Sequence, residues 1–229
     1  MRRVDGLIQY SDYEVSRMTA IGISESKIFI AHNTLPIPNH ADGSGAFKDS
    51  FLFSGRIRTE KKVDIFIRAF SEVISHIPET IKINIIGSGV EKDRLKVLAE
   101  ELGVSDRVIF HGEIFDENKL RPFFHRALAY VSPGAVGLSV LHSFAYGLPI
   151  VTQCDERHGP EFVNVRNKEN SLVYKTYDDL KGILIRLCHD KALSARMGKN
   201  AYDLYAEERT FDVMIEGFRN AIENIDGKL

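Results

Sequence analysis

The sequence lacks the marks of several protein classes. Only two of its 229 residues are cysteines, Cys154 and Cys188, and their spacing matches neither a CxxC pair nor a metal site. We therefore expect two reduced thiols in a cytoplasmic protein. The formal net charge is −2, which does not suggest strong attraction to nucleic acid or to an anionic membrane.

Further absences narrow the choice of protein class. No stretch approaches the roughly 18 consecutive apolar residues of a membrane span, and Asp5 and Asp12 interrupt any apolar region of a secretory leader. No DxD-type acidic cluster is present, so we expect no metal ion. Internal repeats and low-complexity tracts are also missing. What remains is a chain that is 44% hydrophobic and long enough to bury a core.

Apolar strands alternate with helical stretches from Asp49 onward. The expected strands include SFLFSG, IKINIIGSG, RVIFHGEI, LAYVSPG and LPIVTQ, and amphipathic segments such as EKDRLKVLAEELG lie between them. Strands that are apolar throughout, rather than alternating, are typical of a parallel sheet covered by helices on both faces. We predict an α/β fold with a Rossmann-like, doubly wound parallel sheet over residues 49–175.

Two short pieces precede this unit. Residues 1–37 have the pattern of a strand, a helix and a strand, which is too little to hold a core alone; we expect them to pack on the parallel sheet as a remnant with an exposed apolar face. Residues 38–48 are rich in glycine and polar residues and form the clearest linker. The main unit is expected to cover residues 49–229.

The loops that follow the strands are the places to look for chemistry, because ligands of parallel sheets bind beyond the carboxyl ends of the strands. In the first loop, SGRIRTEKK, Gly55 lets the backbone come close to a ligand. Arg56 and either Lys61 or Lys62 could then hold an anionic group. A solvated basic turn is the alternative interpretation.

The second and third loops are rich in glycine. Gly87 and Gly89 bracket a turn into a helix, whose free N–H groups suit an anion or a polar ring edge, although a lone GxG matches only part of a dinucleotide fingerprint. In the third loop, the N–H groups of residues 136–139 would form a backbone cradle for an anion. His142 lies one turn into the next helix, where a packed core histidine is the alternative. In the fourth loop, HGPEFV, His158 and Glu161 are the polar candidates for a ligand contact. An ordinary surface turn is the alternative interpretation.

The order and spacing of the four loops resemble the donor-binding domain of GT-B glycosyltransferases related to the bacterial sugar transferases of glycosyltransferase family four, also called glycosyl transferases group 1. The resemblance covers Val4 to the C-terminus. It implies that residues 1–37 are a remnant of the N-terminal acceptor domain, that residues 38–48 are the interdomain linker, and that residues 49–229 form the nucleotide-sugar donor-binding domain.

The resemblance also implies roles for particular residues. Arg56 and Lys61 match the arginine and lysine that clasp the donor diphosphate, and they would stabilise the negative charge of the leaving group. The residues implied in donor binding are Gly55, Gly87, Gly89, His111, Val136, Gly137, Leu138, Ser139, His142 and Glu161. The glycine turn would lie near the nucleoside, the strand end at His111 near the base, and residues 136–139 near the sugar and the distal phosphate.

The chain departs from the family at one diagnostic point. The family has two glutamates separated by seven residues, and here Gly134 and His142 occupy those positions. In the family the first glutamate contacts the donor sugar and the second holds the ribose hydroxyls. Glycine offers no side chain, whereas histidine can still hydrogen-bond a ribose. A changed donor and loss of activity both stay open.

The implied activity is transfer of a sugar from a nucleoside-diphosphate sugar to an acceptor hydroxyl, with retention at the anomeric carbon, in polysaccharide or other glycan synthesis. The expected partners are the nucleotide sugar and the missing acceptor domain, with no nucleic acid and no resident cofactor, and this chain alone would transfer nothing. The expected location is the cytoplasm, with peripheral association of the full-length protein at the inner face of the membrane left open. A non-catalytic nucleotide-sugar-binding module and another GT-B enzyme, such as a sugar-nucleotide epimerase, are the alternatives.

Overall fold

The computed structural model describes residues 4–35, 37 and 47–226. Its main unit is a six-stranded sheet in which every neighbouring pair of strands is parallel. The strands are β3 (Ser50–Ser54), β4 (Lys82–Ile86), β5 (Val108–Gly112), β6 (Ala127–Ser132), β7 (Ile150–Gln153) and β8 (Ser171–Tyr174). The predicted α/β fold with a Rossmann-like parallel sheet is confirmed.

The order of the strands places the switch point of the sheet at its centre. The order is β5-β4-β3-β6-β7-β8, so the chain winds outward from β3 to β5, returns to the middle at β6, and then winds outward to β8. The loops that leave the neighbouring strands β3 and β6 therefore run in opposite directions, away from each other. A crevice opens between such loops at the carboxyl ends of the strands, and this is where ligands of doubly wound sheets bind.

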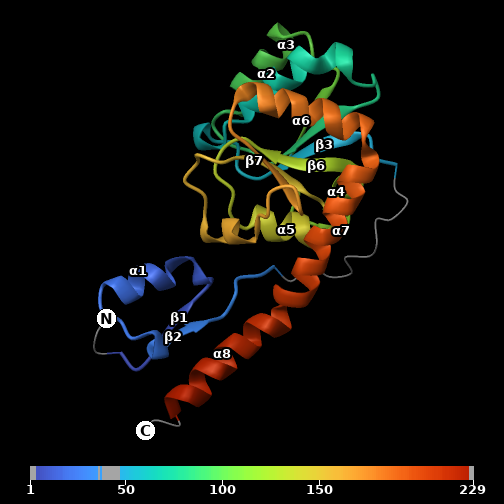
Figure 1. Ribbon diagram of the computed structural model, residues 1–229. Helices are drawn as coiled ribbons and strands as arrows, with labels where there is room; N and C mark the ends of the chain where they lie inside the picture. Colours follow the sequence, from blue (N-terminus) through green and yellow to red (C-terminus); the bar gives the residue numbers. More distant parts are fainter. Residues whose placement is uncertain (1–3, 36, 38–46, 227–229) are drawn as a thin grey trace.

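Helices cover both faces of this sheet. The helices that follow β3 in the chain are α2 (Val63–Val73), α3 (Lys92–Glu101), α4 (Glu117–Arg126), α5 (Ser139–Ala145), α6 (Tyr177–His189), α7 (Lys191–Glu208) and α8 (Phe211–Asp226). The helices α2, α3 and α6 lie on one face, and α5 packs with α7 on the other (Figure 1). Short 3-10 turns add η3 (Thr59–Lys61), η4 (Ile74–His76) and η5 (Pro160–Asn164).

The core lies between the sheet and these helix layers. All six residues of β6 are buried, as expected for a central strand with helices on both sides. The largest fully buried side chains include Phe51, Phe53, Phe66, Phe70, Phe124 and Phe144. Burial raises the pKa of Tyr130 to about 12, and its hydroxyl donates to the Ser54 carbonyl across the β3–β6 pair at 2.7 Å.

The N-terminal unit consists of two parallel strands, β1 (Leu7–Gln9) and β2 (Ile28–Ile30), joined by η1 (Asp12–Glu14), α1 (Val15–Ala20) and η2 (Glu25–Lys27). The expectation that it packs on the parallel sheet needs correction. It packs chiefly on α8, which runs away from the main unit alongside β2 (Figure 1). The expected linker, residues 38–48, lies outside the described residues except for Phe47 and Lys48, which precede β3 without regular structure.

The backbones of α8 and of the segment at the end of β2 approach each other closely at Gly217. A Cβ built on Gly217 of α8 would lie 2.4 Å from the Ile30 carbonyl oxygen and 2.7 Å from the Ala31 Cα, so only glycine allows the strand to lie this close. Several apolar side chains of the two elements stay exposed: Val4, Ile8, Tyr10, Tyr13, Ile21, Phe211, Ile215, Phe218 and Ile222.

This contact predicts opposite effects for two glycine-to-alanine changes in helices. Gly182→Ala in α6 meets no atom within 4 Å and should stabilise the protein by about 0.5–1 kcal/mol, because alanine favours a helix interior. Gly217→Ala should lose that gain to overpacking of about 1–3 kcal/mol and loosen the N-terminal unit. Urea unfolding midpoints, together with the rate of proteolysis within residues 4–35, measure both effects. Equal gains in the two variants would contradict the fit described for Gly217.

Candidate functional site

Two loops at the carboxyl edge of the sheet fit together through glycine. A Cβ on Gly87 would lie 2.0 Å from the Gly55 carbonyl oxygen, and one on Gly89 would lie 2.1 Å from the Ile57 carbonyl oxygen. The Gly55 N–H donates to the Ile86 carbonyl at the end of β4, and the Ile57 N–H donates to the Ser88 carbonyl in the loop after it, each at 2.9 Å. Gly87 and Gly89 both have positive φ values, 126° and 158°. These glycines thus join the loops after β3 and β4 into one wall.

A cleft of about 520 Å³ opens along this wall. It is lined by Arg56, Arg58, Thr59, Glu60, Ser88, Gly89, Val90 and Glu113. Arg56 and Arg58 are both exposed to it, so two guanidinium groups are available to an anionic ligand. Arg56 was expected from the sequence, whereas Arg58 was not, although it lies only two residues further along the same loop.

Lys61 lies deeper and joins the loop after β3 to the loop after β6. Its ammonium donates to the Ala135 carbonyl at 2.5 Å, and burial lowers the pKa of Lys61. The lining of the 520 Å³ cleft includes Arg56 but neither Lys61 nor residues 136–139. The structure thus divides the expected site into two adjoining parts, which meet at Glu60. Lys62, the alternative to Lys61, forms an ion pair with Glu156.

The expected backbone cradle at residues 136–139 is narrower than the sequence suggested. The Val136 N–H donates to His158 Nδ1 at 3.2 Å, so it is not free for a ligand, and Val136 is 2% exposed. The cradle is left with Gly137, Leu138 and Ser139, where α5 begins.

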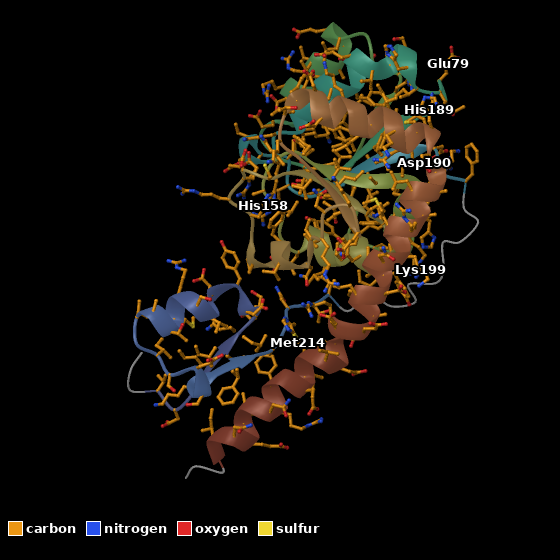
Figure 2. All side chains as sticks on the ribbon, viewed as in Figure 1. Glu79, His158, His189, Asp190, Lys199 and Met214 are labelled. Atoms are coloured by element: carbon orange, nitrogen blue, oxygen red, sulfur yellow. The ribbon has the colours of Figure 1, made fainter. Side chains whose placement is uncertain are left out.

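His158 is held in one tautomer. Because Nδ1 accepts from Val136, the proton resides on Nε2, which donates to the Gln153 carbonyl at 2.7 Å. The ring stacks on Phe162 with centroids 4.0 Å apart, and burial lowers the pKa of His158. Figure 2 shows His158 at one end of the strands of the sheet and Glu79, His189 and Asp190 toward the opposite end.

Glu161 lies beside the start of α5. Its side chain is buried, and Oε2 is 3.7 Å from a Cβ built on Gly137. Oε1 accepts a hydrogen bond from Asn33 Nδ2 at 2.8 Å. Asn33 belongs to the segment that follows β2, and sequence reasoning missed it because no local pattern links two residues 128 positions apart.

The two histidines expected near the nucleoside are tied to other side chains. His111 Nε2 lies 2.8 Å from Asn84 Oδ1 on the neighbouring strand, and burial lowers the pKa of His111. His142 Nε2 lies 2.9 Å from Glu117 Oε1, and its ring packs on Phe124 with centroids 4.4 Å apart. The sequence analysis did not name Glu117.

The position of Gly134 excludes a side chain. A Cβ there would lie 1.9 Å from the Glu60 carbonyl oxygen and 2.7 Å from the Lys61 Cα, and the Gly134 N–H donates to the Lys61 carbonyl at 3.1 Å. The loops after β3 and β6 therefore meet backbone to backbone. A glutamate could not occupy this position without displacing η3.

No group of three or more His, Cys, Asp or Glu side chains is placed to hold a metal ion in the part of the chain that the structure describes. Likewise, none of the helices within those residues has the length and apolar character needed to cross a bilayer.

Comparison with known proteins gives a consistent family. Residues 44–204 match the family model described as glycosyl transferases group 1. A D-inositol 3-phosphate glycosyltransferase of Acidothermus cellulolyticus is 32% identical over 179 residues, which are 72% of this chain but only 39% of the relative. The chain thus spans about two fifths of the length of that relative.

Solved structures share the fold. The lipopolysaccharide outer core galactosyltransferase WaaB in its apo form matches with a TM-score of 0.70 and 21% identity, over 99% of this chain and 63% of that one. The Anabaena protein HepE in complex with UDP matches with a TM-score of 0.78 and 15% identity, over 96% of this chain and 64% of that one.

The neutral state of His158 predicts how stability depends on pH. Its folded pKa lies below the ordinary value of 6.5, so between the two values the unfolded chain binds a proton that the folded chain does not. Stability should therefore fall as the pH drops below 6.5, with a slope of at most about 1.4 kcal/mol per pH unit from this residue. His158→Gln should flatten the slope, whereas His76→Gln, at an exposed site, should leave it unchanged. Urea unfolding between pH 5 and 7.5 measures it, and identical slopes in all three proteins would refute the assignment.

Proposed function

The chain belongs to the glycosyl transferases group 1 family, and on that premise we propose that it is the donor-binding half of a glycosyltransferase. The full-length protein would move a sugar from a nucleoside-diphosphate sugar to an acceptor hydroxyl. The observation that carries the proposal is the cleft at the carboxyl ends of β3, β4 and β5, where Arg56 and Arg58 line the same cleft as Gly89 of the glycine wall. Guanidinium groups suit the oxygens of a diphosphate.

In the proposed reaction the leaving diphosphate gains negative charge as the glycosidic bond breaks, and transfer retains the configuration of the anomeric carbon. Arg56 would stabilise that charge from the cleft. Lys61 uses one of its three ammonium protons on Ala135, so two remain for a phosphate oxygen. Because Lys61 is already held by Ala135, it needs little reorganisation during the reaction, which is the basis of electrostatic catalysis.

The proposal extends to the rest of the protein. The N-terminal unit would belong to the acceptor half, and Asn33 would connect that half to the donor site through Glu161. Similar proteins include a lipopolysaccharide galactosyltransferase and a D-inositol 3-phosphate glycosyltransferase, which fits a role in polysaccharide or other glycan synthesis. We propose a cytoplasmic location, with peripheral association of the full-length protein at the inner face of the membrane, and no transfer by this chain alone.

Arg56→Ala tests the diphosphate role. Loss of a charge-assisted hydrogen bond of about 1.5–3 kcal/mol should weaken nucleoside-diphosphate binding by about ten- to a hundredfold. A thermal-shift panel of UDP-, GDP-, ADP- and dTDP-sugars identifies the ligand, and calorimetry gives its affinity. Arg68→Ala is the matched control, because Arg68 is exposed on α2 and does not line the cleft. Equal affinity in both variants would remove Arg56 from the site.

A second function is favoured by Gly134. The family places a sugar-binding glutamate there, but this structure leaves no room for a side chain. A non-catalytic nucleotide-sugar-binding module would need no such contact. Sugar transfer by the full-length protein separates the two functions: transfer supports the enzyme, and donor binding without turnover by a folded full-length protein supports the module.

A further inference from the structure

A carboxylate and an imidazole from two different helices meet at the carboxyl edge of the sheet. Glu117 is the first residue of α4, and His142 is the fourth of the seven residues of α5. Each of these helices follows a parallel strand, so both begin at the edge where ligands bind. Glu117 Oε1 lies 2.9 Å from His142 Nε2 and accepts a hydrogen bond from the Tyr146 hydroxyl at 2.5 Å.

The Glu117 carboxylate keeps an oxygen for a ligand. In the part of the chain that the structure describes, both hydrogen bonds to it end on Oε1, so Oε2 retains its acceptor sites. The side chains of Glu117 and His142 are 25% and 19% exposed, which leaves the pair open to solvent on one side. Glu113, which lines the cleft, precedes Glu117 on the segment that joins β5 to α4.

The surroundings keep this carboxylate ionised and fixed. Burial opposes its ionisation, but hydrogen bonds from His142 and Tyr146, together with the charge of Arg121 on the same helix, outweigh burial and hold the pKa of Glu117 below its ordinary value. Phe124 packs against the rings of both His142 and Tyr146, with centroids 4.4 and 4.8 Å away. The aromatic contacts orient the two donors, and the donors orient the carboxylate.

We propose that Glu117, positioned by His142 and Tyr146, binds the ribose hydroxyls of the donor nucleotide. This inference rests on the proposed function. Two neighbouring hydroxyls are donors that an ionised carboxylate accepts strongly, and acidic side chains serve this purpose in other doubly wound nucleotide sites. The carboxylate would come from α4, whereas the resembled family places it on α5 at the position of His142. His142 then acts as a positioning residue rather than as the ribose ligand.

The test compares nucleotides that differ only in the ribose. UDP, ADP, GDP and CDP are measured by calorimetry against their 2′-deoxy counterparts at pH 7.5. The wild type should prefer the ribonucleotide by about tenfold or more, as expected for one hydrogen bond to a charged acceptor. Glu117→Gln keeps an acceptor oxygen for both donors but removes the charge, and it should lose most of that preference. Glu117→Asp keeps the charge but withdraws the carboxylate by one methylene, and it should also reduce the preference.

Controls separate a ligand contact from a structural role. Glu79→Gln removes an exposed carboxylate toward the opposite edge of the sheet (Figure 2) and should retain the full preference. A structural role for Glu117 would weaken ribo- and deoxynucleotides equally, and an unchanged ratio in Glu117→Gln would overturn the inference. If the wild type binds none of the eight nucleotides, the proposed function itself fails, which is a distinguishable result. Circular dichroism and the urea midpoint show that each variant is folded.

Discussion

The pairing of β3 with β6 at the centre of the sheet is the constraint on which the rest of the molecule depends. The two strands are separated in the chain by β4, β5 and the helices between them, yet Ser50 pairs with Ala127 and Leu52 pairs with Tyr130. Since both strands are parallel and the winding reverses between them, the loops that leave them diverge. The loop after β3, which contains η3, and the loop after β6, which leads into α5, take their positions from this pair.

The second constraint is the closeness of the loops. Backbone contacts at Gly87, Gly89 and Gly134 are so short that a Cβ would lie about 2 Å from a carbonyl oxygen at each. These contacts hold the loops after β3, β4 and β6 with few side-chain interactions between them. They also limit the chemistry, because the backbone that fixes Lys61 beside Ala135 leaves no space for an acidic side chain at Gly134.

The N-terminal unit joins this arrangement through buried polar contacts. Arg209, between α7 and α8, donates to Asn164 Oδ1 at 2.7 Å, and its carbonyl accepts a hydrogen bond from Thr34. Asn33, the neighbour of Thr34, donates to Glu161 beside the start of α5. Orientation of Glu161 therefore depends on a segment that lies outside the parallel sheet, and this links the start of α5 to the unit that α8 carries.

The sequence by itself determined the parallel sheet and the loops at the carboxyl ends of its strands. Strands that are apolar throughout and glycines at their ends are local signals, and they sufficed to name Arg56, Lys61, Gly87 and Gly89 as candidates. The same signals left His142 open between a ribose ligand and a packed histidine, because a side chain's partner is not encoded in its own neighbourhood.

Only the tertiary structure decided which residues meet. It paired His142 with Glu117 from another helix, engaged the Val136 N–H with His158, and brought Asn33 to Glu161. It also placed the N-terminal unit on α8 rather than on the sheet. Each of these contacts joins positions far apart in the chain. Their partners are set by the winding of the sheet and by backbone spacing, which no periodicity of a single segment records.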